Sequence, residues 1–118
     1  MERGRIAIEN NNVSVNLANG TVWLSQYQIA DLFGVFTSAV NNNIRAILKA
    51  GILNEDKICY LFTDSNRKIV PLYNLEMITA LAFRLTSHQT EVFRKWLLSR
   101  NSTTAILWKL PRIDAMLN

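Results

Sequence analysis

The chain has 118 residues, 49% of them hydrophobic, so we predict one domain with a substantial core. Its formal net charge of +4 is compatible with a nucleic-acid partner. Its single cysteine, Cys59, excludes an intrachain disulfide and a cysteine-rich metal site. Because no secretory signal pattern opens the sequence and no apolar run nears about 18 residues, we expect a cytoplasmic protein without a membrane partner.

The segment of residues 5–24 alternates apolar and polar side chains with a period of two, which predicts two or three short antiparallel strands. Turns are expected at residues 10–12 (NNN) and 18–20 (ANG), because asparagine and glycine favour tight turns. The alternating apolar positions are Ile6, Ile8, Val13, Val15, Leu17, Val22 and Leu24.

A helix-turn-helix is expected over about residues 25–50. Ser25 and Gln28 have the spacing of a capping box, which would start the first helix just after Ser25, and Gly34 would end it in a left-handed conformation. Ala30, four residues before Gly34, is small enough to let the two helices cross closely. An ordinary helical hairpin with a glycine turn is the alternative interpretation.

The second helix should run over about residues 38–50, with Thr37 as its cap. Its apolar stripe, which would hold it against the first helix, consists of Val40, Ile44, Ile47 and Leu48. Asparagine is a poor helix former, so the run NNN at residues 41–43 weakens this helix by about 1–2 kcal/mol relative to alanine. Phe36 stands where a small polar cap is usual, so we expect it either to pack locally or to contact a thymine methyl group.

The outward face of this helix is a candidate DNA-reading surface, because it carries amides and hydroxyls and no acidic residue lies between Thr37 and Ala50 to repel phosphate. Asparagine can pair bidentately with adenine, and arginine can pair with guanine or hold a phosphate. The residues that we predict to enter the major groove are Thr37, Ser38, Asn41 and Asn42. The basic residues expected to flank them are Arg45 and Lys49. Asn43 should lie nearer the helix side, and a merely solvated polar face is the alternative.

Residues 58–72 predict a β-hairpin whose two strands, at about 58–62 and 69–72, flank the polar loop TDSNRK. The hairpin directly follows the second helix of the pair, which is where the wing of a winged-helix domain would lie. Arg67 and Lys68 at its tip are candidate phosphate contacts, with ordinary turn charges as the alternative.

C-terminal helices are expected over about residues 74–110, one capped by Asn74 and another by Ser87. They carry a basic surface that consists of Arg84, Arg94, Lys95 and Arg100. The simplest interpretation is that these charged side chains are solvated on the outer face of the helices. Pro111 would end the last helix, after a tail that contains Ile106, Leu107, Trp108 and Leu110. This apolar tail needs a cover, either its own domain or a second copy in a homodimer formed through the C-terminal helix and tail.

The sequence lacks the usual signs of catalysis, so we expect a protein that is not an enzyme and that uses no cofactor or metal. His88 is its one histidine, the four glycines are not clustered as in a phosphate-binding loop, and Cys59 has the setting of a small buried hydrophobe. The carboxylates are scattered, whereas a metal-dependent nuclease needs several that converge on a metal.

The chain resembles the virulence-associated RhuM family in four segments within about residues 5–100, namely TVWLSQYQIADLFGV, NNNIRAIL, YNLEMITALAFRL and VFRKWL. The family shares W-L-[ST]-Q-x-Q-[IM]-A-x-L-F-G, Y-N-L-[DE]-M-I and F-R-x-W, and the matching positions are Trp23, Gln26, Gln28, Ala30, Phe33, Gly34, Tyr73, Asn74, Phe93 and Trp96. The resemblance implies a bacterial protein, often carried on mobile or pathogenicity-island DNA, with a DNA-binding N-terminal region. Members often have a basic residue at the position of Asn42 and a Ser-Arg pair at Phe36 and Thr37, so this chain has less positive charge there.

These expectations together describe a single α+β domain: a winged-helix-like helix-turn-helix fold with N-terminal and wing β-hairpins and C-terminal helices. The expected function is that of a DNA-binding module, a transcriptional regulator associated with a bacterial mobile element, with double-stranded DNA as its partner. The alternative is an antirepressor-like module that binds another protein and does not bind DNA directly.

Overall fold

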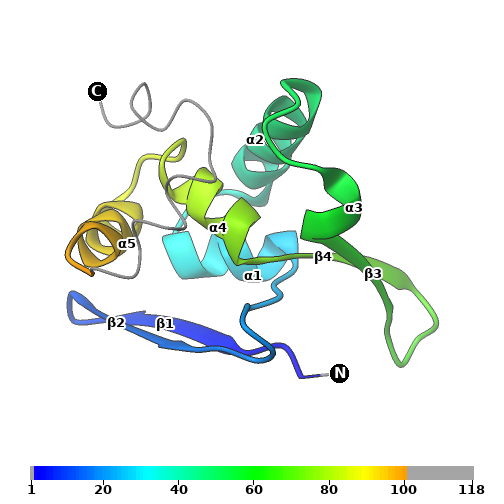
Figure 1. The fold of residues 1–118 in the computed structure, drawn as a ribbon, viewed down its shortest axis with the longest axis horizontal. Coiled ribbons are helices and arrows are strands. Elements are labelled where there is room, and N and C mark those ends of the chain that lie inside the picture. Colours follow the sequence, from blue (N-terminus) through cyan, green and yellow to red (C-terminus); the bar gives the residue numbers. More distant parts are fainter. Residues whose placement is uncertain (1, 101–118) are drawn as a thin grey trace.

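Helices and two small antiparallel hairpins make up the α+β fold of the computed structural model, which describes residues 2–100 (Figure 1). The elements in chain order are β1 (Arg5–Glu9), β2 (Asn12–Asn16), α1 (Gln26–Phe33), α2 (Thr37–Lys49), α3 (Glu55–Ile58), β3 (Cys59–Thr63), β4 (Ile69–Tyr73), α4 (Leu75–Ala82) and α5 (His88–Leu98). In Figure 1 the β1–β2 hairpin lies below the helices, and the β3–β4 hairpin extends to the lower right. The predicted α+β class is confirmed.

The first hairpin follows the predicted alternation, because Ile6 pairs with Val15 and Ile8 pairs with Val13 in its register. Its turn is formed by Asn10 and Asn11, whose φ angles of 50° and 64° are tolerated by asparagine better than by most residues. Residues 18–24 add no third strand to this sheet; they form only the isolated bridges Ala18–Thr21 and Leu24–Tyr73.

The start and the end of α1 are both as predicted. The hydroxyl of Ser25 accepts a hydrogen bond from the backbone N–H of Gln28 at 3.2 Å, and the Gln28 side chain accepts one from the Ser25 N–H at 2.9 Å. This capping box satisfies N–H groups that a helix start otherwise leaves unpaired. Gly34 ends the helix with φ 63° and ψ 41°, a left-handed conformation that glycine adopts without strain.

The start of α2 differs from the prediction. Thr37 is the first helical residue and not the cap; the N-cap is Phe36, whose ring cannot accept a capping hydrogen bond. The helix begins with backbone groups alone, because the carbonyl of Phe36 accepts from the N–H of Ala39 at 3.0 Å and of Val40 at 3.3 Å. At its other end α2 stops at Lys49, one residue before the predicted end at Ala50.

The core lies where α1, α2, α4 and α5 meet, with α4 at the centre of the helices (Figure 1). All residues of α4 from 77 to 82 are buried, which fits its apolar sequence on every side. Phe33 of α1 and Phe93 of α5 have no solvent exposure and meet edge to face, with ring centroids 5.5 Å apart. Burying each such side chain stabilises the fold by about 1.5–3 kcal/mol.

The second hairpin matches its prediction except at its start, where the one-turn helix α3 occupies residues 55–58. Asn54 caps α3 by accepting from the N–H of Asp56 at 3.0 Å, and this helix leaves Ile58 buried in the core. The strands then pair with Leu61 opposite Pro71. Backbone hydrogen bonds between Leu24 and Tyr73, of 3.0 and 2.7 Å, join β4 to the segment that leads into α1.

The predicted helices with caps at Asn74 and Ser87 are both present, as α4 and α5. Within residues 2–100, no helix is sufficiently long and apolar to span a bilayer. Three expectations concern residues 101–118, which lie outside the described part of the chain. They are the contacts of the apolar tail, the end of the helical region near residue 110 and the role of Pro111.

Candidate nucleic-acid interface

The exposed face of α2 is a continuous polar and basic stripe. Ser38, Asn42, Arg45 and Lys49 are all exposed, and their spacings of four, three and four residues align them along one side of the helix. The opposite side consists of Val40, Ile44 and Ile47, whose exposed fractions do not exceed 2%. The only charged side chains of α2 are those of Arg45 and Lys49, so its outer face has a positive potential.

The three consecutive asparagines of α2 do not share this face, because neighbouring residues of a helix point about 100° apart. Asn42 lies in the middle of the stripe and is exposed, whereas Asn41 and Asn43 are half-buried on opposite flanks. Thr37 is half-buried and lies one turn before Asn41, on the same flank. Of the predicted base-reading residues, Ser38 and Asn42 are therefore the most accessible.

Asn43 is used inside the protein. Its Nδ2 donates a hydrogen bond to the carbonyl of Ala39 at 2.8 Å, and its Oδ1 accepts one from the Nε of Arg84 at 3.1 Å. This is consistent with its expected position nearer the helix side, and it leaves Asn43 little capacity for a base.

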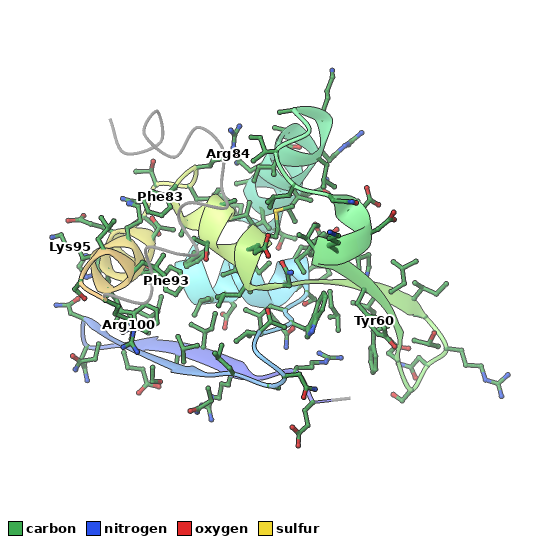
Figure 2. The ribbon with its side chains drawn as sticks, in the orientation of Figure 1. Tyr60, Phe83, Arg84, Phe93, Lys95 and Arg100 are labelled. Atoms are coloured by element: carbon green, nitrogen blue, oxygen red, sulfur yellow. The ribbon has the colours of Figure 1, made fainter. Side chains whose placement is uncertain are left out.

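Arg84 is a candidate site residue that the sequence reasoning missed. It lies in the loop between α4 and α5, and Figure 2 shows it beside α2, where its hydrogen bond to Asn43 holds it. The side chain is exposed and adds a positive charge on the flank of α2 that carries Asn43. No local pattern could have found it, because 41 positions separate Arg84 from Asn43.

The other members of the predicted basic surface are engaged elsewhere. Arg94 donates from Nη1 to the carbonyl oxygens of Ala82 at 2.6 Å and Leu85 at 3.1 Å, where it binds carbonyls at the end of α4. Lys95 pairs with Glu91 at 3.0 Å, and this contact lowers the pKa of the Glu91 carboxyl through its hydrogen bond and its charge. Arg100 lies over the ring of Trp96 at 4.7 Å.

Phe36 projects into solvent at the start of α2. Its exposed fraction is 84%, so the expectation that it packs locally is wrong: the backbone that begins α2 directs the ring away from the core. An open groove of about 490 Å³ lies beside it, lined by Gly34, Val35, Phe36, Ala39, Leu85 and Thr86.

Arg67 and Lys68 are exposed at the tip of the β3–β4 hairpin, in a loop organised by Asp64. One carboxylate oxygen of Asp64 accepts from the N–H of Asn66 at 2.8 Å and of Lys68 at 2.9 Å. In Figure 1 this tip lies at the lower right, α2 lies at the top, and α3 lies between them. The structure therefore does not bring Arg67 and Lys68 together with the predicted residues of α2; they form a second, separate surface.

Two side chains with potential reactivity lie away from α2: Cys59 begins β3, and His88 begins α5. Burial raises the pKa of the Cys59 thiol, and the carboxylate of Glu55 raises it further, so the thiol is protonated at neutral pH and is a weak nucleophile. His88 donates from Nε2 to Oδ1 of Asn11 at 2.6 Å and so joins α5 to the first hairpin. Within the described residues 2–100, no three His, Cys, Asp or Glu side chains are grouped as metal ligands.

A comparison with protein-family models found no match, and comparisons with curated proteins and with solved structures found none either. Several residues of the RhuM-like pattern have structural roles in this fold. Gln28 completes a capping box, Gly34 makes the left-handed turn, and Asn74 caps α4 by accepting from the N–H of Met77 at 3.2 Å. Phe33 and Phe93 meet in the core.

Proposed function

We propose that this chain is a DNA-binding helix-turn-helix module and that α2 is its recognition helix. One observation carries the proposal: the outer stripe of α2 is polar or basic and free of acidic side chains, while its inner face is held firmly by the core. Such a helix offers hydrogen-bonding groups to base edges and positive charge to phosphates.

Individual roles follow from accessibility along α2. Asn42, in the middle of the stripe, pairs with an adenine through its amide, and Arg45 pairs with a guanine or holds a phosphate. Ser38 reads base edges at the N-terminal end of the helix, with Thr37 and Asn41 on its flank. A good bidentate contact of this kind discriminates against the wrong base by about 1–3 kcal/mol.

Phosphate binding is the role proposed for the basic side chains around the stripe. Lys49 lies at the C-terminal end of α2, and Arg84 is held beside the helix by Asn43. Arg67 and Lys68 complete the winged-helix part of the proposal, because the hairpin that carries them follows α2 and α3 in the chain. Since their loop is separated from α2, they would contact phosphates beyond the segment that α2 occupies.

The role as a transcriptional regulator of a bacterial mobile element is supported by the resemblance to RhuM proteins in residues such as Trp23, Gln28 and Asn74. A protein that reads operator DNA suits that role. Dimerisation through the C-terminal helix and tail would let two copies read two half-sites.

The salt dependence of duplex binding tests the proposal. Fluorescence anisotropy with a mixed-sequence duplex, at several salt concentrations, should give a log K that falls linearly with log salt. With Arg45, Lys49, Arg84, Arg67 and Lys68 on phosphates, the slope should be about −4.5, and Arg45→Gln should reduce its magnitude by about one. Lys95→Gln is the matched control, because Lys95 is paired with Glu91, and it should leave the slope unchanged.

An antirepressor-like module that binds a protein is the alternative, and the exposed apolar side chains favour it. Phe36 is 84% exposed, and Leu61 and Ile69 on one face of the β3–β4 hairpin are 63% and 66% exposed. This function predicts binding to a protein partner that is nearly insensitive to salt, together with no measurable duplex binding. That pair of results would replace the DNA-binding proposal.

A further inference from the structure

Phe36 has the highest exposed fraction among the large exposed hydrophobic side chains of residues 2–100, at 84%. It is also the N-cap of α2, a position usually taken by a side chain that accepts a hydrogen bond from the first turn. The ring therefore neither caps the helix nor packs in the core. The exposed ring and the uncapped helix start each cost free energy, and contact between the ring and a partner would offset that cost.

The surroundings of the ring indicate which partner. Phe36 stands at the N-terminal end of α2, directly before the turn in which Ser38 begins the exposed polar and basic stripe that continues through Asn42, Arg45 and Lys49. The residues at the N-terminal end of a recognition helix contact base edges in the major groove. Along those edges the C5-methyl group of thymine is the apolar feature, and phenylalanine is a side chain that can contact it.

The groove beside Phe36 also suits a methyl group. It is open, and its lining includes the apolar side chains of Val35, Ala39 and Leu85. A methyl group placed between the ring and this lining would lose contact with water on several sides, which is favourable for apolar surface. Neither Phe36 nor the side chains that follow it on α2 carry a negative charge that would repel the DNA backbone.

We propose that Phe36 selects thymine, by contacting its C5-methyl group, at one position of the site that α2 reads; this inference rests on the proposed DNA-binding function. The expected size of the effect follows from the burial of one methyl group. That burial is worth about 0.8 kcal/mol, which is about fourfold in Kd.

The test uses the full chain and replaces thymine by uracil, which removes the methyl group and leaves every hydrogen-bonding group in place. A bound sequence is first selected from random duplexes, and each thymine in it is then replaced in turn. Anisotropy at fixed salt should show one position at which uracil weakens binding about fourfold. For Phe36→Ala the same replacement should have no effect, whereas Leu98→Ala, which truncates an exposed side chain on α5, should keep the fourfold loss.

The outcomes separate this inference from the function on which it rests. If no duplex is bound in a salt-sensitive way, the proposed function fails and the thymine contact fails with it. If duplexes are bound but uracil is tolerated at every position, or is equally harmful to the Phe36→Ala protein, DNA binding stands and the thymine contact is overturned. Phe36→Ser, which supplies a capping hydroxyl, provides a second ring-free protein for the same comparison should the alanine variant fold poorly.

Discussion

Arg84 and Asn43 are joined by a hydrogen bond of 3.1 Å between Nε and Oδ1, although 41 positions separate them in the sequence. The bond fixes the guanidinium of a loop residue against the side of α2. The same amide donates to the carbonyl of Ala39 at 2.8 Å, so both ends of Asn43 are occupied. Asn43 therefore orients Arg84, and in the proposed function the exposed guanidinium of Arg84 is the group of this pair that contacts DNA.

The first prediction concerns this pair. Asn43→Ala and Arg84→Ala should each weaken duplex binding, and the two losses should not add in the double variant, because Asn43 acts through Arg84. Alanine favours a helix by about 0.5 kcal/mol more than asparagine, so Asn43→Ala should still fold. Anisotropy on the four proteins of the double-mutant cycle gives the coupling energy, expected to exceed about 0.5 kcal/mol. Strictly additive losses would contradict the positioning role.

The second prediction concerns the amides of α2. Replacing Asn41 and Asn42 together by alanine should raise the free energy of unfolding by about 1 kcal/mol, because alanine is the better helix former at both positions. Duplex affinity should fall, by about 1–3 kcal/mol for each base contact that is lost. Urea denaturation and anisotropy measure the two effects. Asn16→Ala, an exposed asparagine on β2, is the control and should leave affinity unchanged. Unaltered affinity in the α2 variant would remove the base-reading role.

The third prediction concerns the missing cap of α2. Phe36→Ser should stabilise the protein by about 1 kcal/mol, because the serine hydroxyl can accept a hydrogen bond from the first turn. For a domain of this size that gain corresponds to a rise in Tm of about 4–8 °C, measurable by circular dichroism. Phe36→Ala removes the ring without adding a cap and should leave Tm nearly unchanged. A similar Tm for all three proteins would indicate that α2 gains nothing from a cap.

The fourth prediction concerns Cys59, whose thiol pKa is raised by burial and, to a smaller degree, by Glu55. Glu55→Gln should lower that pKa and modestly accelerate alkylation by iodoacetamide at about pH 8, because more thiolate is present. A raised pKa also means that the folded protein binds the thiol proton more tightly than the unfolded chain does. The stability from this group is thus full at neutral pH and declines in alkaline solution. Glu76→Gln, on α4, is the control; an equal acceleration in it would contradict the role of Glu55.

The parts of the fold that sequence patterns predicted correctly depend on interactions between near neighbours. The Ser25–Gln28 capping box joins residues three apart, and Gly34 adopts φ 63° as its position after α1 requires. The turn at Asn10 and Asn11 depends on the conformations of those two residues. The amphipathic stripe of α2 was likewise predictable, because a period of 3.6 residues can be read directly from one segment.

The features that the sequence did not predict depend on competition between two possible helix starts, on a helix too short to show a pattern, or on contacts between residues far apart in the chain. Thr37 is the better capping residue by type, but the backbone starts the helix one residue earlier, at Phe36. The four residues of α3 are too few to produce a periodic pattern. The contact between Arg84 and Asn43, and the direction in which the β3–β4 hairpin extends, both depend on how elements pack, which no short pattern encodes.

Arg94 holds the carbonyls of Ala82 and Leu85, which lie on either side of Arg84 in the chain. The loop that carries Arg84 is thus held by a side chain of α5. If α2 reads DNA as proposed, a substitution at Arg94 or a partner that touches α5 would change operator affinity without altering any atom that faces the bases.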